Sequence, residues 1–124
     1  MKSVELLKRA KELLKNCYSP YSKVQVVALL FGPDGVVEGV NVENASYGLT
    51  VCAERSAVFS AISQGKRNFE GIFIYSPQLM PYPCGACRQV LSEFFREDFK
   101  VIVATDNEEE QLTLGELLPF NFKL

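Results

Sequence analysis

The sequence predicts an α/β sandwich, in which helices cover the faces of a mixed β-sheet. Segments with the apolar spacing of helices alternate along the chain with short runs of β-branched and apolar residues. An early pair of such runs is joined by a Pro-Asp-Gly turn, which is typical of a hairpin. No linker, repeat or low-complexity stretch divides the 124 residues, and 48% of them are hydrophobic. We therefore expect a single domain over residues 1–124.

The first half of the chain predicts a helix, a hairpin and a second helix. We expect the helices over 3–16 and 51–63 and the strands over 24–31 and 36–42. The first helix is amphipathic, with Ser3 as its N-cap, and the loop that starts at Cys17 ends it. Pro33 and Asp34 supply the turn of the hairpin. The second helix is rich in alanine and is expected to be buried, with Gly65 at its end.

The second half alternates strand and helix. We expect strands over 69–75 and 99–104 and helices over 84–95 and 113–118. Both strands are almost continuously apolar, as buried strands are. Thr113 is expected to cap the last helix and Pro119 to stop it. We interpret the acidic run 108–110 as a solvated turn.

Composition excludes several classes of function. Thirteen Lys and Arg against fifteen Asp and Glu give a net charge of −2, which argues against binding to nucleic-acid backbones. The longest apolar run, Val26 to Phe31, has six residues and is far too short to span a membrane. The charged N-terminus also lacks the apolar core of a secretion signal. We expect a cytoplasmic protein that binds neither nucleic acid nor membrane.

The cysteines point to metal or thiol chemistry. The chain has four cysteines and no histidine, so zinc sites that mix the two residue types are excluded. Cys52 begins one predicted helix, and Cys84 and Cys87 begin another. If both helices follow neighbouring strands, their first turns meet at one edge of the sheet. Three thiolates there would hold Zn²⁺ at about 2.3 Å and leave a fourth position for water, as in catalytic zinc sites.

Two residues after Cys52 fit such a centre. Glu54 is close enough to exchange protons with water at the metal without being a ligand. Arg55 is placed to hydrogen-bond the thiolates and to offset their negative charge.

Simpler interpretations exist for each of these residues. Cys84 and Cys87 alone would suit a thioredoxin-like dithiol. A structural zinc site would need Cys17 or a carboxylate as fourth ligand. Glu54 would serve any helix as an acid in its first turn.

The motif residues resemble the zinc signature of a known enzyme family. Cys52-Ala53-Glu54 with Pro83-Cys84-Gly85-Ala86-Cys87 is similar to the cytidine deaminases, specifically their small homotetrameric form. Residues 18–22, 39–47, 84–91, 113–114 and 116–119 resemble further family segments in the same order, so the likeness covers nearly the whole chain.

The resemblance implies a three-layer α-β-α sandwich with a mixed five-stranded sheet and one Zn²⁺ per subunit. It also implies a hydrolase of pyrimidine salvage that converts cytidine and deoxycytidine to uridine and deoxyuridine with release of ammonia. Glu54 would deliver protons first to N3 of the base and then to the departing amino group.

Further roles come from the resemblance alone. Asn41 and Glu43 match positions that bind the ribose hydroxyls. The backbone around Ala53 and Cys84 would hold the pyrimidine ring. Tyr47 and Phe122 resemble residues that reach into a neighbouring subunit's site, which implies a homotetramer with shared sites.

Two positions depart from the family pattern. Val24 stands where the family usually has a Phe that packs on the base, and Val27 stands where it usually has Gly. Loss of an aromatic face weakens base binding by about 1 kcal/mol, unless another aromatic residue has taken this role.

Other functions compatible with these residues are deamination of a modified cytidine, a blasticidin-type deaminase and a non-catalytic zinc or dithiol module. Deaminases that edit polynucleotides usually have His as first ligand and a basic surface, which Cys52 and the net charge of −2 do not match.

Overall fold

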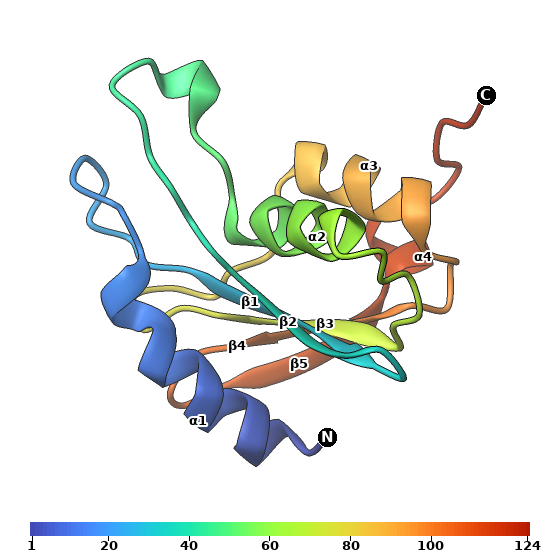
Figure 1. Cartoon of the computed structure of the whole chain (residues 1–124), viewed down its shortest axis with the longest axis horizontal. Helices are drawn as coiled ribbons and strands as arrows, with labels where there is room; N and C mark the ends of the chain where they lie inside the picture. The colour runs from blue at the N-terminus through green and yellow to red at the C-terminus, as the bar shows by residue number, and fades with distance from the viewer.

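A five-stranded mixed sheet forms the centre of the computed structural model, which describes residues 1–124 (Figure 1). The strands are β1 (Val27–Gly32), β2 (Gly35–Val40), β3 (Gly71–Tyr75), β4 (Lys100–Ala104) and β5 (Glu109–Thr113), in the order β2-β1-β3-β4-β5. Only β3 and β4 are parallel; every other pair is antiparallel. The helices are α1 (Ser3–Leu13), α2 (Ala53–Ser63), α3 (Gly85–Phe94) and α4 (Leu114–Leu117), with short 3-10 turns η1 (Leu14–Asn16) and η2 (Tyr47–Leu49).

Helices cover both faces of the sheet, so the expected three-layer sandwich is confirmed. Figure 1 shows α1 on one face and α2, α3 and α4 on the other. Each face of the sheet has its own hydrophobic core, and strand β1 contributes side chains to both because successive side chains point to opposite faces. Its Ala28 and Leu30 pack with residues of α2 and α3, whereas Val27 and Leu29 pack with residues of α1. No helix is long and apolar enough to cross a bilayer.

Strand β1 begins three residues later than the expected start at residue 24. The side chain of Asn41 explains the difference, because it takes the place of a partner strand. Its Oδ1 accepts from Val26 N at 3.1 Å, and its Nδ2 donates to Val24 O at 2.8 Å.

The acidic run at 108–110 is a turn only at Glu108, whose carbonyl oxygen accepts from Thr105 N at 2.9 Å. Strand β5 begins at Glu109 and pairs with β4. An edge strand with one solvated side tolerates acidic residues, and here two of the carboxylates accept hydrogen bonds. Ser3 Oγ donates to Glu109 Oε2 at 3.1 Å, and the hydroxyl of Tyr82 donates to Glu110 Oε1.

The contact between Ser3 and Glu109 also corrects the predicted N-cap of α1. The residue in the cap position is Lys2, and the hydroxyl of Ser3 bonds β5 instead of the helix backbone. The first helix was expected to reach residue 16, but α1 ends at Leu13 and a 3-10 turn occupies residues 14–16. Two other predictions for helix ends are confirmed. Gly65 follows α2 with φ of +74°, and Thr113 caps α4 in a capping box with Glu116.

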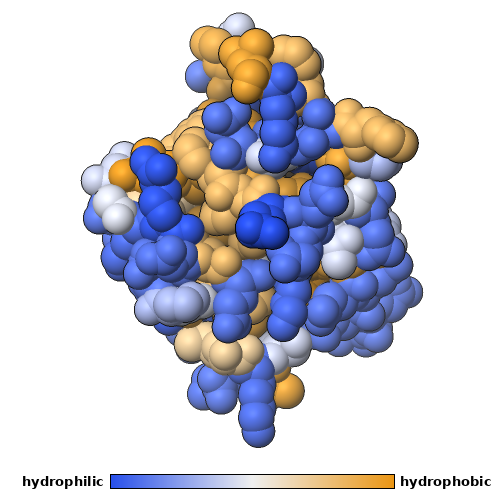
Figure 2. Space-filling model, turned by 90° about the vertical axis from the view of Figure 1, so that its right-hand side faces the viewer, coloured by the Kyte–Doolittle hydropathy of each residue, from blue (hydrophilic) through white to orange (hydrophobic).

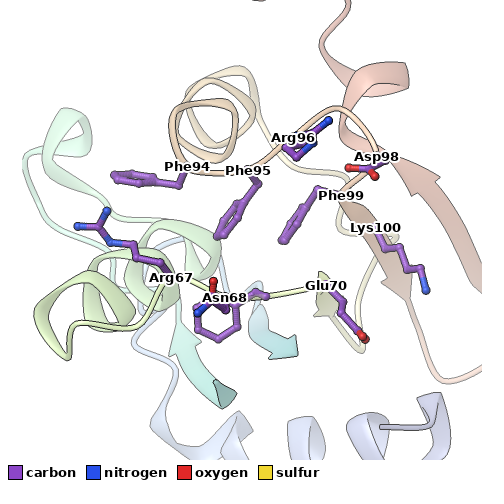
Figure 3. Close-up of a pocket in the computed structure, with 10 residues that line it drawn as sticks. Arg67, Asn68, Glu70, Phe94, Phe95, Arg96, Asp98, Phe99 and Lys100 are labelled. Carbon is purple, nitrogen blue, oxygen red and sulfur yellow. The ribbon is translucent and has the colours of Figure 1, made fainter. Parts of the chain in front are cut away.

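A cluster of aromatic rings closes the end of the sheet at which β3 and β4 begin. The rings of Phe95 and Phe99 stack in parallel with centroids 4.1 Å apart, and the Arg67 guanidinium lies 5.6 Å from the centre of the Phe94 ring (Figure 3). These residues line a cavity of about 420 Å³. This end faces the viewer in Figure 2, where apolar surface shows between hydrophilic side chains. None of the predicted site residues lines this cavity.

The first turn of α2 lies directly on β2 because residue 39 has no side chain. A Cβ atom at Gly39 would come within 2.4 Å of both Ala53 O and Ala57 N. Ala53 and Ala57 are themselves completely buried. Gly39 therefore sets how closely the start of α2, and with it Cys52, approaches the sheet.

We expect Gly39→Ala to lower the free energy of unfolding by about 3 kcal/mol, because the added methyl group must displace helix backbone. Denaturant unfolding of the zinc-loaded protein measures this change. Gly48→Ala is the matched control, since a Cβ atom there meets nothing within 4 Å. An equal effect of the two substitutions would contradict the close packing of α2 on β2.

Candidate metal centre

Three cysteine sulfurs from two distant segments meet at the N-terminal ends of α2 and α3. Cys52 and Cys84 occupy the N-cap positions of these helices, and neither side chain makes a capping hydrogen bond. The Sγ atom of Cys84 lies 3.8 Å from Cys52 Sγ and 3.5 Å from Cys87 Sγ. All three sulfurs lie within 4.8 Å of one another. They are free thiols, since S–S bonds are far shorter.

These distances fit a tetrahedral zinc ion. A Zn–S bond of about 2.3 Å in tetrahedral geometry places neighbouring sulfurs about 3.8 Å apart. The sulfurs also lie at the N-terminal, positive ends of two helix dipoles, where negative charge is stabilised. The predicted convergence of Cys52, Cys84 and Cys87 is confirmed.

Charge around the sulfurs favours loss of a proton. The neighbouring Cys87 thiol and the adjacent Arg55 guanidinium lower the pKa of Cys52 to about 5. Cys52 in turn raises the pKa of Cys87, so this pair retains one proton at neutral pH. A metal cation that binds here displaces that proton.

Arg55 connects the sulfurs to the chain before α2. Its Nη2 donates to Cys52 Sγ at 3.4 Å and to Thr50 O at 3.5 Å. Its Nε is buried without a partner. A permanent cation in this place offsets the negative charge of three thiolates.

Glu54 lies buried next to the sulfurs, with only 4% of its surface exposed. Burial raises the pKa of Glu54 to about 7, because desolvation disfavours the carboxylate. The proximity of Cys52 contributes to this rise. A carboxyl group with a pKa near neutral can both accept and release a proton at physiological pH.

Cys17 does not belong to the cluster, which argues against the structural-zinc alternative with Cys17 as fourth ligand. Its thiol donates to Val26 O at 3.4 Å, and burial raises its pKa. The dithiol alternative is also weakened, because Cys52 joins the two sulfurs of the Cys-x-x-Cys motif.

A cavity of about 180 Å³ adjoins the sulfurs, and a second cavity of about 380 Å³ lies beside it. The first, which we call the metal-side cavity, is lined by Val26, Asn41, Thr50, Cys52, Ala53, Glu54, Leu79, Pro81, Tyr82 and Cys84. The second, which we call the outer cavity, is lined by Tyr21, Ser22, Glu43, Asn44, Tyr47 and Thr50. Thr50 borders both, so the two cavities are neighbours.

The polar residues predicted for substrate binding already have partners within the chain. Asn41 holds the backbone at Val24 and Val26, yet an amide can form four hydrogen bonds and Asn41 uses two. Glu43 Oε1 accepts from the backbone N–H groups of Tyr21 at 2.9 Å and Ser22 at 3.1 Å. The Ser22 hydroxyl donates to Glu43 Oε2 and, with these N–H groups, lowers the pKa of the carboxyl. Asn41 lines the metal-side cavity and Glu43 lines the outer cavity.

The remaining predicted residues lie away from the metal-side cavity. Tyr47 lines the outer cavity in η2, at the tip of a segment that projects from the body of the molecule (Figure 1). Phe122 is 68% exposed near the C-terminus. Val24 lines neither cavity. Val27 is completely buried against the α1 layer, so its extra bulk does not enter either cavity.

Three residues of the loop before α3 line the metal-side cavity but were not predicted: Leu79, Pro81 and Tyr82. The sequence signal that could have indicated a place at the cavity is that these residues shortly precede Cys84. Which of them would face the metal centre depends on the course of an irregular loop, and periodicity does not reveal that course.

Taken together, the sandwich and the cluster of three sulfurs define a zinc-binding α/β protein whose metal centre borders a cavity. Comparison with known proteins gives the particular family. Residues 1–105 match the model of the cytidine and deoxycytidylate deaminase zinc-binding region. The chain belongs to this deaminase family.

Individual relatives agree over nearly the whole chain. A cytidine deaminase of Halalkalibacterium halodurans is 45% identical over 120 residues, which are 94% of this chain and 91% of that protein. The crystal structure of cytidine deaminase from Burkholderia pseudomallei superposes with a TM-score of 0.91 at 40% identity, covering 98% of this chain and all of that one (100%). For cytidine deaminase from Mycobacterium tuberculosis the TM-score is 0.79 at 35% identity, with 100% of both chains covered.

We expect Cys52→Ala to weaken zinc binding by more than about 100-fold, because loss of a direct ligand should cost more than loss of an outer partner. Zinc titration against a competing chelator measures the affinity. Cys17→Ala is the matched control and should keep the affinity of the unchanged protein. Equal zinc affinity in Cys52→Ala and the unchanged protein would exclude Cys52 as a ligand.

Proposed function

We propose that this protein is a zinc-dependent cytidine deaminase, which hydrolyses cytidine and deoxycytidine to uridine and deoxyuridine and releases ammonia. The observation that carries the proposal is a buried carboxyl group, Glu54, beside three zinc-suited sulfurs at one cavity. Family membership and cytidine deaminase relatives at up to 45% identity support the same reaction. They do not favour a blasticidin-type reaction or a non-catalytic module.

Cys52, Cys84 and Cys87 would hold Zn²⁺, which would lower the pKa of a water molecule bound to it. Glu54 would take one proton from a water molecule whose oxygen bonds to C4 of the base, and it would deliver this proton to N3. It would then carry the proton of the new C4 hydroxyl group to the amino nitrogen, so that the C4–N bond breaks, ammonia leaves and C4 keeps the oxygen as a carbonyl group. The pKa of about 7 suits a group that accepts a proton in one step and gives it up in the next. Arg55 keeps the thiolates in place and offsets their charge.

The two adjoining cavities suit the two parts of a nucleoside. The base lies in the metal-side cavity, where the backbone around Ala53 and Cys84 holds it. The sugar extends toward the outer cavity, and its hydroxyls bind Asn41 and Glu43. Each of these side chains keeps hydrogen-bonding capacity beyond its contacts in the chain, which supports this role. Asn41 and Glu43 also order residues 21–26, so the sugar meets a preformed wall.

We further propose a homotetramer in which neighbouring subunits complete each site with Tyr47 and Phe122. Both side chains are largely exposed, at 76% and 68%, and large exposed aromatic residues are enriched in interfaces. Figure 1 shows both of their segments extending beyond the body of the molecule. Residues 1–124 form one domain in this proposal, and the protein works in the cytoplasm, where thiols remain reduced for zinc.

Glu54→Gln should retain zinc and lose at least about 100-fold in kcat, because the amide cannot transfer the proton. The loss of cytidine absorbance and the zinc content of the same sample measure both quantities. Glu5→Gln, on exposed α1, is the control and should keep the kcat of the unchanged protein. Turnover close to normal in Glu54→Gln would remove Glu54 from the proton path.

Removal of zinc by a chelator should abolish deamination of cytidine and deoxycytidine, and added Zn²⁺ should restore it. Adenosine should not react with the protein either before or after zinc removal. Ultraviolet assays of the three nucleosides before and after zinc removal measure this. Undiminished turnover in metal-free protein would overturn the proposed reaction.

A further inference from the structure

One aromatic residue lines the metal-side cavity, and neither the family signature nor the proposed mechanism gives this residue a role. Tyr82 is the only aromatic residue among the ten that line the cavity, and it is 48% exposed. The other apolar lining residues, including Val26 and Leu79, are aliphatic and offer no π face. Within one chain, Tyr82 is therefore the only lining residue on which a planar ring that enters this cavity can stack.

Hydrogen bonds from Tyr82 itself and from an earlier residue of the same loop hold Tyr82 in place. The Tyr82 hydroxyl donates to Glu110 Oε1 on the neighbouring strand β5. Earlier in the same loop, Gln78 Oε1 accepts from the backbone N–H of Gln25 at 3.0 Å, and Gln78 Nε2 donates to Gln25 Oε1 at 3.1 Å. A ring that is already oriented loses little conformational freedom when a ligand binds.

We infer that Tyr82 is the stacking platform for the planar base in the metal-side cavity and that Glu110 is the residue that positions its ring. This inference rests on the proposed function, because it places the base in the cavity beside the sulfurs. Val24 lines neither cavity, so the aromatic contact is supplied from the loop before α3 and not from the start of the hairpin.

Stacking recognises the flatness of a ring more than the identity of its substituents, because every planar base has a π face. The site should therefore distinguish a planar pyrimidine from a puckered one. Uridine and 5,6-dihydrouridine provide this comparison, since they share the sugar and both carbonyl groups and differ in the saturation of one ring bond.

The test measures the inhibition constants of uridine and 5,6-dihydrouridine against cytidine turnover in the unchanged protein, Tyr82→Phe, Tyr82→Leu and Glu110→Ala. The unchanged protein should bind uridine about tenfold more tightly, which is at the lower end of base–aromatic stacking. Tyr82→Leu should lose this preference and raise the KM for cytidine about tenfold with little change in kcat. Tyr82→Phe should retain the preference. Glu110→Ala should reduce it about threefold, because the ring is then free to turn.

Val4→Ala is the control, since Val4 is an exposed residue of α1 on the opposite face of the sheet. This substitution should change the inhibition constant of neither uridine nor 5,6-dihydrouridine. Zinc content measured on each variant shows whether the metal centre is intact. If Tyr82→Leu loses zinc, the result from Glu110→Ala and the ratio in the unchanged protein decide the question.

Equal affinity of the unchanged protein for the two ligands would overturn the inference, and so would an unaltered ratio in a zinc-loaded Tyr82→Leu protein or in Glu110→Ala. These outcomes leave cytidine turnover intact and so differ from failure of the proposed function. In that case, the unchanged protein would not deaminate cytidine at all.

Discussion

The meeting of two helix N-termini at one end of the sheet is the constraint on which the candidate site depends. The parallel pair β3 and β4 requires a crossover, and α3 supplies it. The start of α2 reaches the same place because Gly39 lets its first turn lie against β2. Cys52 and Cys84 then become neighbours although 32 residues separate them. The backbone, and not any contact between the sulfurs, brings them together.

Burial and charge act in opposite directions on adjacent residues of this site. Cys52 is held toward its thiolate form by the neighbouring thiol and by Arg55. Glu54, two residues further along the same turn, is held toward its neutral form by burial. The first condition suits a metal ligand and the second suits a proton carrier. Two acid groups in one stretch of three residues thus differ in their pKa shifts, because hydrogen bonds and charge dominate at Cys52 and burial dominates at Glu54.

Much of this arrangement was predictable from sequence because its signals are local. The spacing of Cys84 and Cys87, the alanine-rich α2 and the apolar strands each carry their own pattern. The residue pattern did not predict strand β5, because its acidic residues resemble a solvated turn. The pairing of β5 with β4 shows that it is an edge strand. The late start of β1 depends on the side chain of Asn41, which no periodicity displays. The position of Tyr82 depends on the path of a loop.

The acidic composition of β5 also limits how copies of the chain can associate. An edge strand with unpaired backbone groups invites another sheet to continue it, which leads to aggregation. Here Glu108, Glu109 and Glu110 are all exposed at this border. Two such borders brought together would place carboxylates of like sign in close proximity. A growing ribbon of sheets is thereby disfavoured at β5.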